Sequence, residues 1–266
     1  MKNESANRIN FYKFLSGELS LPEFEKWIYE NKELESEIGG EVYTELISFN
    51  FSSHDTIPFI KKIVLSCFDW KEYEEWRTIN LLTGILENKI EIVLATRKMR
   101  QLYLEQLDTM TKPHISSGLA IGYESELDSC PLESEYHLYN KLKLKTLLEP
   151  VNWYKKPILE QVSQELEELT NPEVKTINLE HVVNIDHFHE IFMEKFNFPD
   201  YYGKNWDAFW DTITGIVELP KILKLKNWKK FKKQKQFKND SKILEKIISD
   251  YNKEFSNKEI IIYNSW

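Results

Sequence analysis

Glycine and cysteine are scarce in this chain of 266 residues, which has eight of the first and two of the second. Scarce glycine favours packed helices over flexible linkers. The two cysteines, Cys67 and Cys130, lie far apart in sequence, so they imply no disulfide framework and suit a reducing compartment. We therefore expect an apolar core to stabilise the protein, and 41% hydrophobic and 14% aromatic residues suffice to build one.

Long apolar segments are also missing. No run approaches the roughly 20 residues that a membrane helix needs. The first residues, MKNESANRIN, are polar and mixed in charge, unlike a signal peptide. We expect a cytoplasmic protein with no membrane partner.

The common motifs of enzymes and metal sites are absent as well. The chain has no P-loop, dinucleotide fingerprint, G-x-S-x-G or HExxH sequence. His181, His187 and His189 cluster in sequence, but the last two stand two residues apart on an expected helix and point to different sides. No cysteine pair completes a zinc site. We interpret these residues as surface histidines and expect no metal, no cofactor and no enzyme activity.

The net charge of −8 is unevenly distributed along the chain. Residues 1–172 hold 29 acidic and 19 basic side chains, whereas residues 173–266 hold 14 acidic and 16 basic ones. An acidic surface repels nucleic acid and favours a basic protein partner. A nucleic-acid partner is therefore not expected.

Helical spacing of apolar residues dominates the first two thirds of the chain. Two stretches depart from it: Ile47, Phe49 and Phe51 alternate with polar residues, and residues 119–123 are mostly apolar, so both predict strands. We expect a mainly helical α+β domain over residues 1–170, with a candidate sub-boundary near residue 112. Pro172 then stops a helix before the next predicted strand, which places a second domain at residues 173–264.

Residues 198–220, FPDYYGKNWDAFWDTITGIVELP, carry the most specific pattern in the chain. Asn205 is a good N-cap and Gly215 stands at the expected C-terminal cap, which predicts a helix near 206–214. Helical spacing then gives an apolar stripe and a polar stripe with Trp210 between them. The apolar stripe is Trp206, Phe209, Ile213 and Ile216, and the polar stripe is Asp207, Asp211 and Thr214.

The like charges of Asp207 and Asp211 are one helical turn apart, so they weaken the isolated helix. A cationic partner would turn that cost into a gain, and aromatic side chains beside desolvated charges are typical of interface hot spots. An ordinary solvated face near the helix N-terminus, or paired carboxylates in acid–base catalysis, would show the same spacing. Spacing alone does not separate these three interpretations.

Part of this pattern resembles the signature of the barstar family, inhibitors of the ribonuclease barnase: Pro199, Tyr201-Tyr202-Gly203, Asn205, Asp207-Ala208, Trp210-Asp211 and Thr214-Gly215. The likeness covers roughly residues 173–264. It implies an α/β domain in which helices flank a three-stranded parallel sheet, with the first strand from residue 174, a helix near 186–196 and the last strand at 260–263. Two positions depart from the family, which has tryptophan in place of Ile216 and leucine in place of Trp206.

The resemblance implies an immunity protein, or antitoxin, that inhibits a cognate secreted ribonuclease toxin. An acidic helix and loop would plug the active site of the toxin, and acidic side chains would take the place of RNA phosphates. The contact set carried over by position is Tyr201, Tyr202, Gly203, Asn205, Asp207, Trp210, Asp211, Thr214 and, from a later helix, Asp250.

The front of the chain resembles a module that recurs at the start of bacterial immunity proteins, on Leu15, Gly17, Phe24, Glu25, Trp27, Tyr29 and Glu45. We interpret the stripe of Phe24, Trp27 and Ile28 as core. The module would be a second immunity unit, a dimerisation element or a receptor for another toxin, and the sequence leaves these roles and the oligomeric state open.

A rival function comes from residues 221–238, which contain nine lysines. These lysines could bind phosphate backbones while the interleaved Trp228, Phe231 and Phe237 stack on bases. The alternative is a solvated helix whose lysine stems cover apolar surface. We favour the solvated helix, because the rest of the chain is acidic.

Overall fold

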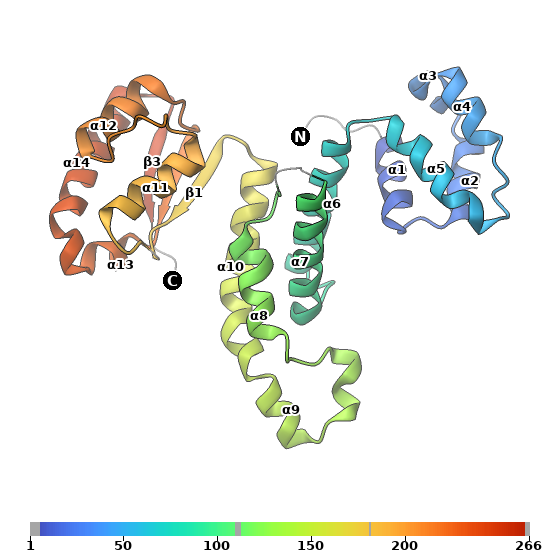
Figure 1. The fold of residues 1–266 in the computed structure, drawn as a ribbon, viewed down its shortest axis with the longest axis horizontal. Coiled ribbons are helices and arrows are strands. Elements are labelled where there is room, and N and C mark those ends of the chain that lie inside the picture. Colours follow the sequence, from blue (N-terminus) through green and yellow to red (C-terminus); the bar gives the residue numbers. More distant parts are fainter. Residues whose placement is uncertain (1–5, 110–112, 181, 264–266) are drawn as a thin grey trace. The chain divides into compact units, whose positions relative to one another are not determined.

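The computed structural model describes residues 6–109, 113–180 and 182–263. The chain divides into two compact units, Met1–Leu169 and Thr170–Trp266 (Figure 1). The candidate sub-boundary near residue 112 and the side chain of His181 lie outside the described residues. Within the described part, no helix is long and apolar enough to cross a membrane.

The first unit begins with short helices around an aromatic core. Phe14 stacks on Phe24 with ring centroids 3.9 Å apart, and Phe24 and Ile28 are fully buried, which confirms the interpretation of this stripe as core. The elements are α1 (Ala6–Ser16), α2 (Leu21–Glu30), α3 (Leu34–Ile38), α4 (Gly40–Ile47), the short turn η1 (His54–Thr56) and α5 (Ile57–Ser66).

Longer helices form a second core in the same unit. Leu82, Met99, Leu119, Ile158 and Val162 are buried together in it. The elements are α6 (Trp70–Leu86), α7 (Ile92–Asp108), η2 (Gly118–Gly122), α8 (Tyr123–Leu127), η3 (Glu133–Leu138), α9 (Lys141–Leu147) and α10 (Glu149–Thr170).

Neither strand predicted for residues 1–170 forms, and the regular elements described there before β1 are all helical. Ile47 ends α4, and the chain then turns because Asn50 Oδ1 accepts a hydrogen bond from the Ser52 backbone N–H at 3.0 Å. Leu119 and Ala120 are both buried in the wide helical turn η2, whereas neighbours in a strand point to opposite faces. The two strand predictions are wrong, and the mainly helical expectation is confirmed.

A three-stranded parallel sheet forms the base of the second unit, as expected. Its strands lie in the order β1 (Val174–Asn178), β2 (Ile222–Lys226) and β3 (Glu259–Tyr263). Parallel strands need long crossover connections, and helices supply them here. Between β1 and β2 lie α11 (Ile185–Phe196), α12 (Trp206–Asp211) and the wide turn η4 (Thr212–Ile216); between β2 and β3 lie α13 (Trp228–Lys233), η5 (Lys235–Phe237) and α14 (Lys238–Glu254) (Figure 1).

Aromatic side chains of these helices fill the core over the sheet. Phe192 of α11 meets Phe209 of α12 edge to face, with ring centroids 4.9 Å apart. Phe188 contacts both Phe209 and Phe231, so one buried ring joins three helices. These contacts hold α12 against the domain through its apolar side and leave its polar side facing outward.

Candidate protein-binding site

The loop before α12 is a compact turn. Asn197 ends α11 in the left-handed conformation, with φ of 50°. The Tyr202 backbone N–H donates to the Pro199 carbonyl at 2.9 Å and closes the turn. A Cβ atom added at Gly203 would lie 3.0 Å from Asn205 Nδ2, so glycine at this position leaves room for the Asn205 side chain.

Asn205 caps α12, as its position in the sequence predicts. Its Oδ1 accepts a hydrogen bond from the Ala208 backbone N–H at 2.9 Å, and its Nδ2 donates to the Gly203 carbonyl at 3.2 Å. The first satisfies a backbone donor that the helix leaves unpaired, and the second ties the loop to the cap. One side chain thus fixes both the start of α12 and the loop before it.

The helix ends later than predicted. The wide turn η4 continues it to Ile216, where the Val217 N–H donates to the Thr212 carbonyl at 2.9 Å. Gly215 does not have a positive φ, so it is not the left-handed cap that its position predicts. Ile216 is 50% exposed and lies outside the apolar stripe, because η4 has more residues per turn than the 3.6 that the spacing rule assumes.

The polar stripe faces solvent. Asp207 and Asp211 are exposed, and Thr214 is half-buried with its hydroxyl donating to the Trp210 carbonyl at 2.8 Å. In the described part of the chain, neither carboxylate forms an ion pair or a side-chain hydrogen bond, although 16 lysines lie in this unit. The pair is neither sealed inside the domain nor neutralised by its own lysines.

The two neighbouring tyrosines have opposite environments. Tyr201 is 80% exposed at the tip of the loop, whereas Tyr202 is 7% exposed and belongs to the core. The Tyr202 hydroxyl lies 2.5 Å from Nδ1 of His189 on α11. Tyr201 is thus available to a partner, and Tyr202 anchors the loop that carries it.

His189 is not the surface histidine that its sequence position indicates. It is 1% exposed and packed between aromatic rings, among them Trp206 at 5.2 Å between centroids. Burial lowers the pKa of His189 to about 4, so the ring is neutral at pH 7 and its Nδ1 can accept the Tyr202 proton. Among the described residues no group of His, Cys, Asp and Glu could hold a metal ion.

Asp250 lies on α14, which packs beside α12. Trp206 Nε1 donates to Asp240 Oδ1 at 2.9 Å and joins the first turns of the two helices. Asp250 is partly exposed near the end of α14, and its carboxylate lies 3.9 Å from Lys253 Nζ.

The sequence analysis did not identify two residues, His189 and Asp240, that support the loop and α12 through contacts with Tyr202 and Trp206. Asp240 is 34 residues from its partner Trp206, and no local pattern indicates that pairing. The only available signal for His189 was its place four residues before Met193 on the apolar face of an expected helix.

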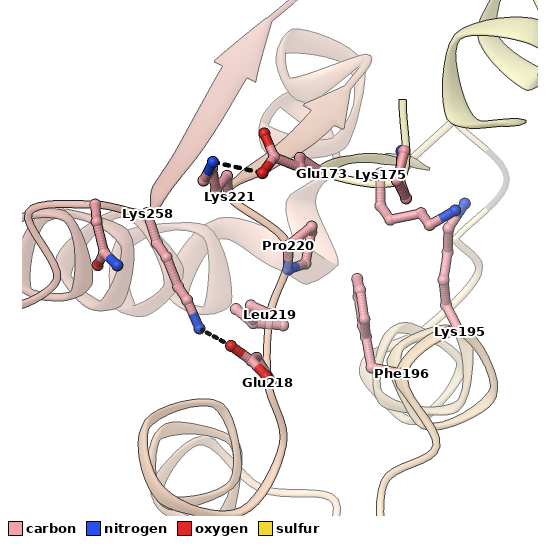
Figure 2. Close-up of a pocket in the computed structure, with 11 residues that line it drawn as sticks. Glu173, Lys175, Lys195, Phe196, Glu218, Leu219, Pro220, Lys221 and Lys258 are labelled. Carbon is pink, nitrogen blue, oxygen red and sulfur yellow. Dashed lines mark hydrogen bonds and ion pairs between the residues drawn. The ribbon is translucent and has the colours of Figure 1, made fainter. Parts of the chain in front are cut away.

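A pocket of about 440 Å³ in the second unit lies where the three strands begin. Its walls carry two ion pairs, Lys221 with Glu173 and Lys258 with Glu218 (Figure 2). Asp207 and Asp211 do not line it. The catalytic interpretation needs both carboxylates in a deep pocket. Because neither of them lines this pocket, the pocket does not support that interpretation.

Two comparisons bear on this unit. Residues 173–263 match the family described as Barstar (barnase inhibitor). A putative ribonuclease inhibitor, YrdF of Bacillus subtilis (strain 168), is 53% identical over 45 residues, which are 17% of this chain and 50% of YrdF. The chain thus spans half the length of that relative. Together with the parallel sheet and the loop–helix geometry, these matches show that residues 173–263 form a barstar-family domain.

Proposed function

We propose that this protein is an immunity protein that inhibits a ribonuclease toxin in the cytoplasm of the producing cell. The observation that carries the proposal is the exposed pair Asp207 and Asp211, which has no cationic partner among the described residues. The family match and the name of the relative, a putative ribonuclease inhibitor, support it.

The chemistry of inhibition is electrostatic. A ribonuclease active site must hold RNA phosphates with cationic side chains, so two carboxylates one turn apart offer it a substitute. Two opposite unit charges 4 Å apart attract by about 4 kcal/mol at an effective dielectric constant of 20. Because an unpaired carboxylate is costly to bury, the face would bind tightly only opposite cationic groups.

Each residue of the face has a distinct role in the proposal. Asp211, in the last turn of α12, is the main anion, and Asp207 supports it. Tyr201 and Trp210 contribute aromatic surface that excludes water around the charges. The remaining members act at the edge or from behind: Thr214 and Asp250 extend the face, and Tyr202, Gly203 and Asn205 hold the loop and helix in place.

Inhibition of this kind uses no covalent chemistry, cofactor or metal. The protein would occupy the active site of the toxin rather than transform a substrate. The family match and the name of the relative also favour an inhibitor over an enzyme.

The test is protection of cells from the toxin. The proposal expects the toxin gene in the neighbouring reading frame, and the nuclease domain found there is expressed from an inducible promoter together with wild-type protein or with Asp211→Ala. We expect the wild type to restore growth and the variant to fail, although its circular dichroism and melting temperature match the wild type. If Asp211→Ala protects as well as the wild type, the proposed face is wrong.

A further inference from the structure

A second charged surface lies on the same domain, opposite in sign to the α12 face. Trp228, Phe231 and Phe237 of α13 and η5 are all buried, and Phe231 stacks on Phe237 at 4.4 Å between centroids. All the remaining side chains of α13 are lysines. Exposed lysines follow one another closely through α13, η5 and the start of α14, and we call this group the α13 lysine face: Lys229, Lys230, Lys232, Lys233, Lys235 and Lys238.

The charges of the α13 lysine face are only partly compensated. Lys230 pairs with Glu180, and Lys232 pairs with Glu245. In the described part of the chain, Lys233, Lys235 and Lys238 form no ion pair. Lys238 is also the first residue of the long helix α14, where the positive end of the helix dipole disfavours a cation. An anionic partner would relieve this repulsion.

The negative net charge of the whole chain does not reflect the local charge of this surface. Unit Thr170–Trp266 carries 16 lysines and 14 acidic residues, and the acidic excess belongs to unit Met1–Leu169. Between residues 228 and 242 there are seven lysines and one acid, Asp240, which is bound to Trp206. Because charges are screened beyond about 8 Å at physiological salt, the local lysines decide what binds here.

The chemistry of the face favours a phosphate backbone over an acidic protein. Protein interfaces centre on buried apolar anchors and are depleted in lysine. All large apolar side chains from Trp228 to Lys242 are buried, and the exposed ones beside this segment are two separate aliphatic side chains, Val183 and Ile243, rather than aromatic anchors. The nucleic-acid hypothesis for residues 221–238 also needs Trp228, Phe231 and Phe237 to stack on bases. This part of the hypothesis is wrong, because all three rings face the core.

We propose that the α13 lysine face binds the phosphate backbone of nucleic acid, without stacking on bases or reading their sequence. This function is separate from the proposed inhibition and uses different residues. Binding through lysine–phosphate contacts alone is expected to give a Kd on the order of 1–100 µM at physiological salt. Three phosphate contacts to a single strand would weaken binding roughly twentyfold between 50 and 200 mM salt.

The experiment measures fluorescence anisotropy of labelled 20-nucleotide oligo(U) RNA and oligo(dT) DNA with the full-length protein. We expect both probes to bind with similar affinity and with this salt dependence. The triple variant Lys233→Glu, Lys235→Glu, Lys238→Glu is expected to bind at least tenfold more weakly. Its melting temperature and circular dichroism report whether the fold is kept.

A matched control reverses three exposed lysines in the other unit, Lys141→Glu, Lys143→Glu and Lys145→Glu on α9. It should retain binding if the α13 lysine face is responsible. Asp211→Asn should also retain it, which separates this proposal from the inhibitory function. Absence of binding by the wild type at 50 mM salt, an equal loss in the α9 control, or tighter binding of poly-L-glutamate than of nucleic acid would each overturn the proposal.

Discussion

The hydroxyl of Tyr202 forms a 2.5 Å hydrogen bond with the buried Nδ1 of His189 and ties the exposed loop before α12 to helix α11. His189 Nε2 has no hydrogen-bond partner among the described residues. Among the described residues, the bond to Tyr202 is therefore the hydrogen bond of this ring, which otherwise packs against aromatic side chains. The position of Tyr201 and of the α12 cap depends on this anchor.

The first prediction concerns this hydrogen bond. Tyr202→Phe leaves the buried Nδ1 without its hydrogen-bond partner, which is expected to lower the free energy of unfolding by about 1–3 kcal/mol. The matched control is Tyr201→Phe, because the same hydroxyl is removed from a side chain that is 80% exposed. It should change stability by less than about 0.5 kcal/mol. Urea unfolding of both variants measures the difference, and equal effects would contradict the anchor.

The second prediction concerns pH. The pKa of His189 falls from 6.5 to about 4 on folding, because burial disfavours the charged ring. Between these values the unfolded chain binds more protons than the folded one. The contribution to stability is therefore complete above pH 6.5 and is lost as pH falls toward 4.

His189→Gln removes the titrating group and keeps an amide that can accept from Tyr202. The loss of stability between pH 7 and pH 5, measured by urea unfolding, should be smaller in this variant than in the wild type. Asp186, Asp240 and Lys204 influence the same ring but remain in both proteins. Parallel pH profiles for the two proteins would exclude His189 as the titrating group.

The third prediction concerns the helix cap. Asn205→Ala removes the acceptor of the Ala208 N–H and is expected to cost about 1 kcal/mol of stability. Asn205→Ser retains a capping oxygen and should recover most of this loss. The comparison by thermal unfolding isolates the cap, and a serine variant as unstable as the alanine variant would argue against it.

The fourth prediction concerns the second unit alone. Among the described residues, its core is formed by side chains between Ile177 and Ile262. We propose that it folds as an independent domain, so a fragment of residues 170–266 should unfold cooperatively in urea and still inhibit the toxin. A fragment with no cooperative transition would show that the domain needs residues 1–169.

Much of the second unit can be predicted from its sequence, because local signals and tertiary structure agree there. Asn205 caps a helix, as its residue type predicts. One apolar segment well before this helix and another just after Pro220 each form a strand of the sheet. The resemblance supplied what spacing could not, namely that the strands pair in parallel. For residues 47–51 the local pattern led to a wrong strand prediction. Side chains in this turn alternate between more buried and more exposed positions, as they do in a strand.

The candidate site is only partly predictable. The outward direction of Asp207 and Asp211 follows from helical spacing, since Phe209 and Ile213 must face the core. The burial of His189 and Tyr202 does not follow, because it depends on the meeting of α11 with a loop 13 residues away. The inward direction of the aromatic rings in the lysine-rich segment is likewise set by tertiary packing.

The most direct measurement is the dissociation constant of the full-length protein with the purified nuclease domain of the toxin that the proposal expects in the neighbouring reading frame, for the wild type, Asp211→Asn and Glu194→Gln. Glu194 is an exposed acid on α11, so its variant makes the same change of charge away from the α12 face. Loss of one member of a buried charge pair is expected to weaken binding by about 2–5 kcal/mol, or roughly thirtyfold or more, in Asp211→Asn alone. Equal affinities for all three proteins, or equal losses in both variants, would contradict an inhibitor whose α12 carboxylates enter the active site.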